Sequence, residues 1–240
     1  MFRLVWRLTN IWTPQTMPVP EMFRIKICGL TDFENAIAVA HSGADAIGLN
    51  FFPGSKRKVG TDTAEKIANS VRGEVQIVGL FVNATLEEIE KTHQRVGFDW
   101  IQLHGDESVE FALSLDDRLG VPILAACRGT LDRWPAATDK FRPQALLMDA
   151  AVQGAFGGTG QQTDWQLAAT WRTIPDLARF VLAGGLTPEN VGQAIATVQP
   201  TAVDVAGGVE ISGKPGMKDL AKVEVFVSTA QQAFAQIASS

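Results

Sequence analysis

Cysteine is scarce in this sequence, which has only Cys28 and Cys127 among its 240 residues. Two cysteines do not make the disulfide framework of a small secreted domain, and no CxxC pair or Cys/His cluster has the spacing of metal ligands. These absences argue against a disulfide-stabilised secreted protein and against a cysteine-based metal site. We therefore expect a cytoplasmic protein, in a reducing compartment, that binds no metal.

Long apolar runs and an excess of positive charge are also missing. No run reaches the roughly 18–20 residues that a membrane-spanning helix needs, and 26 acidic residues outnumber 21 basic ones. The net charge of −5 gives no electrostatic reason to bind nucleic acid. We expect neither a membrane nor a nucleic acid as a partner, and an anionic ligand would have to be held by a local site.

The length permits one large domain or two small ones, and no linker, low-complexity tract or charge block divides the chain. We predict one barrel domain over residues 22–240, preceded by an extension over residues 1–21. Arg3 and Arg7 interrupt the apolar residues of the extension, which fits a secretory signal badly. Two interpretations stay open: a segment ahead of the folded domain, with Met22 as an alternative start, or an amphipathic segment for membrane contact or transit.

From Phe23 onward, short apolar segments alternate with longer segments of helical periodicity. The predicted strands are Phe23–Ile27, Ala46–Phe51, Ile77–Val82, Trp100–Leu103, Pro122–Ala126, Ala145–Met148, Phe180–Ala183 and Ala202–Val205. The predicted helices are Asp32–His41, Ala64–Ser70, Leu86–Val96, Val109–Leu119, Gln166–Thr173, Glu189–Val198 and Leu220–Ile237. Apolar strands separated by helices are typical of parallel strands buried on both faces, and this number of units fits a single (β/α)8 TIM barrel, an α/β fold. An open doubly wound sheet is the alternative, because periodicity does not show closure.

Three threonines mark predicted helix starts. They are Thr31, Thr85 and Thr187, the last of which precedes a proline. Threonine is a good N-terminal cap, and proline is favoured in the first helical turn.

In either architecture, ligands bind beyond the carboxyl ends of the strands, so the residues that follow each apolar run are the site candidates. Most are polar or glycine: Cys28-Gly29, Asn50, Asn83, His104-Gly105, Arg128, Asp149, Gly184-Gly185, and Asp204 with Gly207-Gly208. A lone glycine pair is most often a tight turn. Two pairs after the last two strands, where barrels frequently bind phosphate, predict that Gly184, Gly185, Gly207 and Gly208 present backbone N–H groups to an anion.

Several motifs occur in one order: KICGLT, GLNFFPGSKRKV, GLFVN, QLHGDE, LLMDA, GGTG with DW, LAGGL, and VDVAGGVE with PGMKD. Over residues 22–234 this combination closely resembles the phosphoribosylanthranilate isomerase family of tryptophan biosynthesis. The resemblance implies a (β/α)8 barrel that converts a small phosphosugar, N-(5-phosphoribosyl)anthranilate, to a 1-deoxyribulose phosphate by an Amadori rearrangement. It implies no metal or organic cofactor, and we expect a monomer or a homodimer.

The resemblance assigns Cys28 as the base that removes the C2′ proton and Asp149 as the acid that protonates the ring oxygen. Taken alone, Cys28 is more often a small buried hydrophobe, and Asp149 is as easily a residue that binds loop N–H groups. The thiol pKa of about 8.5 must fall by about 1.5 units, roughly 2 kcal/mol, to serve at neutral pH, and a helix N-terminus is the candidate cause. The pKa of Asp149 must instead rise by about 3 units.

Further roles follow from the same resemblance. Arg57 would bind the anthranilate carboxylate through its planar guanidinium, although a Lys/Arg cluster is by itself usually solvated surface, and His104 would line the pocket without transferring a proton. Thr163 stands where the family usually has phenylalanine, and Ala206 stands where it more often has serine. Phosphate contacts after the last strand must therefore rely on backbone N–H groups. We also expect the glycine-rich loop 150–163 to act as a lid.

This interpretation has three alternatives. The aminoimidazole-carboxamide ribotide isomerase family has an aspartate where Cys28 stands and is built from two matching halves. Indole-glycerol-phosphate synthase would need catalytic lysines at strand ends, whereas Lys26 lies inside the first strand. A catalytically inactive phospholigand-binding barrel would need neither Cys28 nor Asp149.

Overall fold

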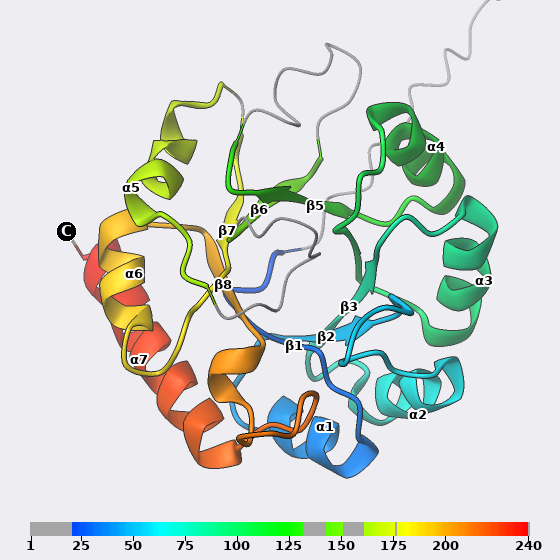
Figure 1. Cartoon of the computed structure of the whole chain (residues 1–240), viewed down its shortest axis with the longest axis horizontal. Coiled ribbons are helices and arrows are strands. Elements are labelled where there is room, and N and C mark those ends of the chain that lie inside the picture. The colour runs from blue at the N-terminus through cyan, green and yellow to red at the C-terminus, as the bar shows by residue number, and fades with distance from the viewer. Residues whose placement is uncertain (1–20, 132–142, 151–160, 176, 240) are drawn as a thin grey trace, which may run out of the picture.

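The computed structural model describes residues 21–131, 143–150, 161–175 and 177–239. Its parallel strands form a closed barrel in chain order, and β1 pairs with both β2 and β8 (Figure 1). The strands are β1 (Ile25–Cys28), β2 (Ala46–Asn50), β3 (Gln76–Phe81), β4 (Trp100–Leu103), β5 (Ile123–Arg128), β6 (Ala145–Asp149), β7 (Phe180–Leu182) and β8 (Ala202–Val205). The pairing of the first strand with the last confirms the (β/α)8 barrel and excludes the open sheet.

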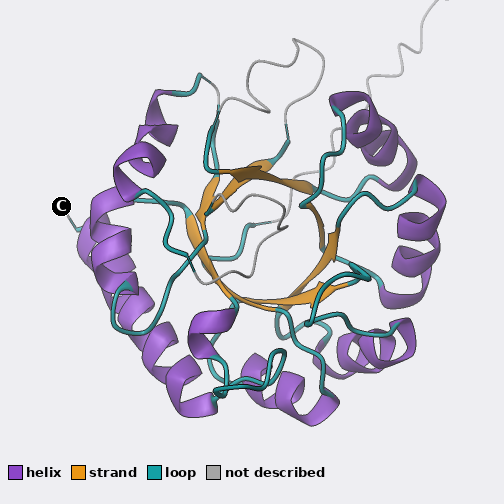
Figure 2. Cartoon of the chain, viewed as in Figure 1, coloured by secondary structure: helices purple, strands orange, loops and turns teal. Residues whose placement is uncertain are grey.

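Helices surround the barrel and cover the outer face of its strands (Figures 1 and 2). Among the described residues they are α1 (Phe33–Ala40), α2 (Thr61–Val71), α3 (Leu86–Val96), α4 (Val109–Leu119), α5 (Trp165–Ala168), α6 (Val191–Val198) and α7 (Leu220–Ala238). Two short 3-10 helices are η1 (Ala169–Thr173) and η2 (Gly207–Val209). The segment Gln166–Thr173, predicted as one α-helix, is therefore a single α-helical turn that continues as η1.

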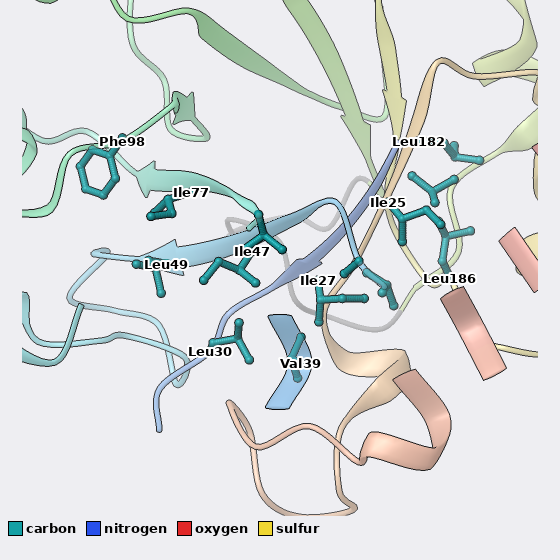
Figure 3. Packing of buried hydrophobic residues seen from close by; sticks show 14 of the residues in the cluster. Ile25, Ile27, Leu30, Val39, Ile47, Leu49, Ile77, Phe98, Leu182 and Leu186 are labelled. Atoms are coloured by element: carbon teal, nitrogen blue, oxygen red, sulfur yellow. The ribbon is translucent and has the colours of Figure 1, made fainter. Parts of the chain in front are cut away.

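Alternate residues of each strand face opposite sides of the barrel wall, because side chains alternate along a strand. Ile25, Ile27, Ile47 and Leu49 belong to the main apolar core, together with Val39 of α1 (Figure 3). This core lies between the strands and the helices and holds the two layers together.

A second apolar cluster fills the interior of the barrel. It includes Ala46, Trp100, Ala145 and Ala202, each of which is the first residue of its strand. Polar interior side chains such as Gln102, Asp149 and Asp204 come later in the same strands. The amino ends of the strands therefore hold an apolar plug, and the carboxyl ends hold polar groups.

Only some of the predicted helix starts are found in the structure. Thr85 caps α3, as predicted, and the cap is a reciprocal capping box with Glu88. Asp32, not Thr31, caps α1, because its carboxylate accepts the hydrogen bond from a free N–H group of the first turn. α6 begins at Val191, later than the prediction after Thr187, because the intervening residues close a separate turn.

Two predictions fall outside the described ranges. They concern the extension over residues 1–21, of which only Glu21 is described, and the lid loop, whose residues 151–160 are not. Both stay predictions.

Candidate active site

Two adjoining cavities lie at the carboxyl ends of the strands. The larger has a volume of about 360 Å³ and is lined mainly by residues that follow β7 and β8. The smaller has a volume of about 60 Å³ and is lined by residues at the ends of β1, β4 and β6, among others. Arg57, Asp149, Asp204 and Ala206 line both cavities. The two cavities therefore form one continuous site.

Cys28 is the last residue of β1, rather than the first residue after it. It lines the smaller cavity and is 5% exposed. Gly29 has a φ of +77°, and a Cβ atom there would lie 2.6 Å from Cδ of Arg57. Gly48 of β2 leaves the space that the sulfur occupies, since a Cβ atom at Gly48 would lie 2.6 Å from Sγ of Cys28. Two glycines thus make room for the thiol and for the arginine beside it.

The charges around Cys28 act in opposite directions. Burial raises the pKa of the Cys28 thiol, because the thiolate loses its hydration. The Lys26 ammonium is the strongest opposing group, the Asp204 carboxylate adds to the rise, and the charge of Lys218 again opposes it. The net pKa lies above its ordinary value. This direction is opposite to the one expected for the base, and lysines, rather than a helix N-terminus, supply the opposing positive charge.

Asp149 is the last residue of β6 and is 9% exposed. Its Oδ1 accepts a hydrogen bond from the Ala150 N–H (2.8 Å), and its Oδ2 lies 3.3 Å from Nε2 of His104. The other ring nitrogen of His104, Nδ1, lies 2.7 Å from Nε2 of Gln102. Asp149, His104 and Gln102 all line the smaller cavity with Cys28. The sequence-predicted acid and base therefore flank the same space, from strands on different sides of the barrel.

Arg57 is held in place by a carboxylate that the sequence did not reveal. Its Nε and Nη2 donate to the two oxygens of Glu210 at 2.7 Å each. Glu210 also accepts from the Gly216 N–H (2.8 Å) and from Nζ of Lys218 (3.0 Å). Burial would raise the pKa of Glu210, but the hydrogen bonds from Arg57 and the charge of Lys218 outweigh it, so that the pKa is lowered. The guanidinium plane is thereby fixed beside both cavities.

The four predicted glycines line the larger cavity together: Gly184 and Gly185 after β7, and Gly207 and Gly208 after β8. Gly184 and Gly185 adopt left-handed φ values of +84° and +66°. A Cβ atom at Gly208 would lie 1.9 Å from the Leu186 carbonyl oxygen, so the two loops touch through their backbones and only glycine fits.

Thr163 takes a polar role at the position where the resemblance leads one to expect phenylalanine. It is 3% exposed, and its hydroxyl donates to the Ala183 carbonyl at 2.7 Å. Its own N–H donates to the Gly184 carbonyl at 3.3 Å. Thr163 therefore ties the chain ahead of α5 to the end of β7, next to the glycine-lined cavity.

Two strand-end residues lie outside the site. Asn83 accepts from the Asp106 N–H and donates its own N–H to Glu107, both at 2.7 Å, while the Arg128 side chain forms an ion pair with Asp106. Neither Asn83 nor Arg128 lines the two cavities. These contacts join the loops after β3, β4 and β5 to one another.

Sequence reasoning missed four polar residues of the site: Lys26, Gln102, Glu210 and Lys218. Lys26 and Gln102 precede Cys28 and His104 by two positions and so share a strand face with them. That period of two could have identified them. Glu210 and Lys218 lie within the motifs VDVAGGVE and PGMKD, but the local pattern does not show that Glu210 pairs with Arg57, 153 positions away.

No group of three or more His, Cys, Asp or Glu side chains among the described residues is arranged to hold a metal ion. In that same part of the chain, no helix is long and apolar enough to cross a membrane.

A closed parallel barrel with a polar site at the carboxyl ends of its strands defines the class of (β/α)8-barrel enzymes. Residues 25–229 match the family model described as N-(5′-phosphoribosyl)anthranilate (PRA) isomerase. The chain belongs to this family.

Named relatives are similar over most of their length. The N-(5′-phosphoribosyl)anthranilate isomerase of Geobacter sp. (strain M21) is 41% identical over 211 residues, which cover 88% of this chain and 99% of that protein. That of Acidithiobacillus ferrooxidans is 44% identical over 210 residues, covering 86% and 97%. The crystal structure of phosphoribosyl anthranilate isomerase from Thermotoga maritima superposes with a TM-score of 0.76 at 33% identity, covering 88% of this chain and 100% of that one.

Proposed function

We propose that this chain catalyses the Amadori rearrangement of N-(5-phosphoribosyl)anthranilate to 1-(2-carboxyphenylamino)-1-deoxyribulose 5-phosphate, with Cys28 as general base and Asp149 as general acid. One observation carries the proposal: Cys28 and Asp149 line one cavity that adjoins a second, glycine-lined cavity. Membership of the family supports the substrate. A related crystal structure, 33% identical, contains reduced 1-(o-carboxyphenylamino)-1-deoxyribulose 5-phosphate.

The reaction needs two proton transfers on one sugar. Asp149 gives its proton to the furanose oxygen as the C1′–O bond breaks, and the nitrogen lone pair forms the C1′=N bond of a Schiff base. The Cys28 thiolate then takes the C2′ proton, and the C–H electrons form a C1′=C2′ bond while the nitrogen regains its lone pair. The resulting enolamine tautomerises to the ketose. Because burial raises the pKa of Cys28, kcat should rise with pH above neutrality as the thiolate forms.

The charged ends of the substrate have separate partners in this proposal. The phosphate occupies the larger cavity, against Gly184, Gly185, Gly207 and Gly208, where backbone N–H groups can approach it. Nε and Nη2 of Arg57 donate hydrogen bonds to Glu210. The N–H groups of Nη1 remain as donors for the anthranilate carboxylate. His104 lines the pocket beside the reacting carbons.

We further propose that the barrel from Met22 onward carries the activity in the cytoplasm, as a monomer or a homodimer. The cytoplasm is supported by Cys28 and Cys127, which are both described and form no disulfide. A homodimer is supported by the Thermotoga maritima relative, whose isomerase is described as dimeric.

The direct test is the fluorescence decay of freshly made phosphoribosylanthranilate after addition of the protein. We expect turnover by the wild type and a loss of at least about 10²-fold in kcat for Cys28→Ser, with KM little changed. Asp149→Asn should lose a comparable factor. Cys127→Ser is the matched control, because Cys127 is fully buried in the core between strands and helices.

Calorimetric titration with a substrate analogue separates this proposal from an inactive phospholigand-binding barrel. Binding of the analogue without any turnover by the wild type would support the inactive barrel. A fully active Cys28→Ser protein would leave Cys28 as a packing residue.

A further inference from the structure

Lys26 is a fully buried lysine to which the proposed reaction gives no task. It precedes Cys28 by two residues on β1, so both side chains lie on the inner face of the strand. A buried ammonium is costly unless it is paired. Nζ of Lys26 donates to Oε1 of Gln102 on β4 (2.9 Å) and lies 2.9 Å from Oδ1 of Asp204 on β8. The lysine is thus held at the centre of the barrel by two other strands.

The end of the Lys26 side chain lies close to the sulfur of Cys28. A Cβ atom at Gly48 would lie 2.6 Å from Sγ of Cys28 and 3.0 Å from Cε of Lys26, so both groups border the same point. Burial would lower the pKa of Lys26, but Asp204 and then Cys28 outweigh burial and raise it, which favours the ammonium form of Lys26. The smaller cavity thus has a positive charge directly beneath its proposed base.

Lys26 also determines how Gln102 is oriented. An ammonium has donors only, so the amide oxygen of Gln102 must face Nζ, and the amide N–H2 must face His104. Nδ1 of His104 therefore accepts the hydrogen bond from Gln102, and the ring proton sits on Nε2. Nε2 makes no hydrogen bond within the described part of the chain, and Oδ2 of Asp149 lies 3.3 Å from it. The Nε2–H group is thus held beside the proposed acid, at the cavity.

We infer that Lys26 is a positioning residue for both halves of the reaction: its ammonium stabilises the thiolate of Cys28 and, through Gln102, fixes His104 as the Nε2–H tautomer that faces Asp149. The inference rests on the proposed function for its catalytic meaning. Its two structural consequences can be measured without substrate.

Several charges act on Cys28, and the experiment must distinguish Lys26 from them. They come from four segments: Lys26 on β1, Asp204 on β8, Arg57 after β2 and Lys218 ahead of α7. Of these, Lys26 has the largest effect that favours the thiolate, and Asp204 acts against it. Replacing Lys26 by a neutral residue should therefore raise the pKa of Cys28 more than replacing Arg57 or Lys218 in the same way.

The first measurement is the ultraviolet absorbance of the thiolate as a function of pH, in a Cys127→Ser background. We expect Lys26→Met to shift the Cys28 titration to higher pH by at least about one unit, which corresponds to a tenfold smaller thiolate fraction at neutral pH. With substrate, the rising limb of kcat against pH should move by the same amount, while KM changes little. If the Cys28 thiol of Lys26→Met titrates with the same pKa as in the wild type, the inference is wrong, whatever the activity of the variant.

Lys26→Met leaves Asp204 as a buried unpaired charge and can fail to fold. Lys26→Met/Asp204→Asn removes both charges of the pair and keeps the test decisive. The comparison is with Asp204→Asn alone: the Cys28 thiol should titrate with a higher pKa in the double variant than in Asp204→Asn, because only the double variant also lacks the Lys26 ammonium. Equal pKa values of Cys28 in these two variants, or a lower one in the double variant, contradict the inference.

Gln102→Leu separates the two effects. It should leave the Cys28 titration unchanged, while nitrogen NMR of the His104 ring shows loss of the pure Nε2–H tautomer. The spectrum is simple to assign, since the chain has only three histidines. Lys26→Met should also change the tautomer, because the amide of Gln102 is then free to turn over. An unchanged His104 tautomer in Lys26→Met would overturn the second half of the inference, and Gln102→Leu is the positive control, since it removes the bond to Nδ1 directly.

Discussion

Gly48→Ala tests whether the space beside Cys28 is required for the chemistry. The new Cβ atom would lie 2.6 Å from Sγ of Cys28, and 3.0 Å from both Cα of Cys28 and Cε of Lys26. Carbon contacts are comfortable only from about 3.5 Å. The sulfur must therefore retreat by about 1 Å, and the backbone of β1 limits where it can go.

The expected losses follow from that displacement. A misplacement of about 1 Å at a reacting group costs about 10²-fold in rate, so kcat should fall by about that factor. Overpacking lowers the free energy of unfolding by about 1–3 kcal/mol. Alanine offsets roughly 0.5–1 kcal/mol of this loss, because it is more stable than glycine within a strand. We expect a net loss of about 1–2 kcal/mol in the free energy of unfolding, which urea denaturation measures. The fluorescence assay measures kcat on the same variant.

Gly79→Ala is the matched control. It lies on the neighbouring strand β3, and its Cβ atom would meet the Phe98 ring at 2.8 Å, in the core between strands and helices (Figure 3). A similar loss of stability with unchanged kcat is expected there. If Gly48→Ala keeps the kcat of the wild type while it loses stability, the position of the sulfur is not limiting and the reasoning is wrong.

Three further predictions concern the rest of the site. Gly185→Asp should raise KM or abolish the binding of inorganic phosphate measured by calorimetry, whereas Gly213→Asp, at an equally left-handed φ of +74° but outside both cavities, should bind normally. Glu210→Gln should lower the free energy of unfolding by about 3 kcal/mol at neutral pH. Because the pKa of Glu210 is depressed, its contribution is present above the unfolded-state pKa and is lost as the pH falls through the folded-state pKa, so urea denaturation of variant and wild type should converge in acid. A chain that starts at Met22 should keep full turnover, and a large loss in a well-folded truncation would contradict the domain boundary.

The strands could be predicted because each is a short apolar run between helical patterns. β4 and β8 have the predicted bounds, and the other strands differ by a few residues at their ends. Closure could not be predicted, since it depends on β1 pairing with β8, for example Ile25 with Val203. Pairing across the whole chain leaves no trace in local periodicity.

The site could be predicted as far as position along a strand determines it. Cys28, Asp149 and the glycines meet because parallel strands bring all their carboxyl ends to one rim. The bond between Arg57 and Glu210 joins residues 153 positions apart, and no motif contains both. The rise in the pKa of Cys28 comes from desolvation by the packed interior, which is a property of the folded barrel rather than of the residues around the cysteine.

The pairing of Arg57 with Glu210 has a consequence for how the site responds to ionic strength. In the form that the proposed reaction requires, with Cys28 as the thiolate and the proton on Asp149, Lys26, Arg57 and Lys218 are matched in number by Cys28, Asp204 and Glu210, so the charged groups around the cavities cancel. The chain as a whole carries −5. A substrate with a phosphate and a carboxylate is therefore repelled at long range and bound at short range by directional donors. Added salt, which screens the repulsion, should speed its association, the reverse of what is seen where a positively charged surface attracts an anion.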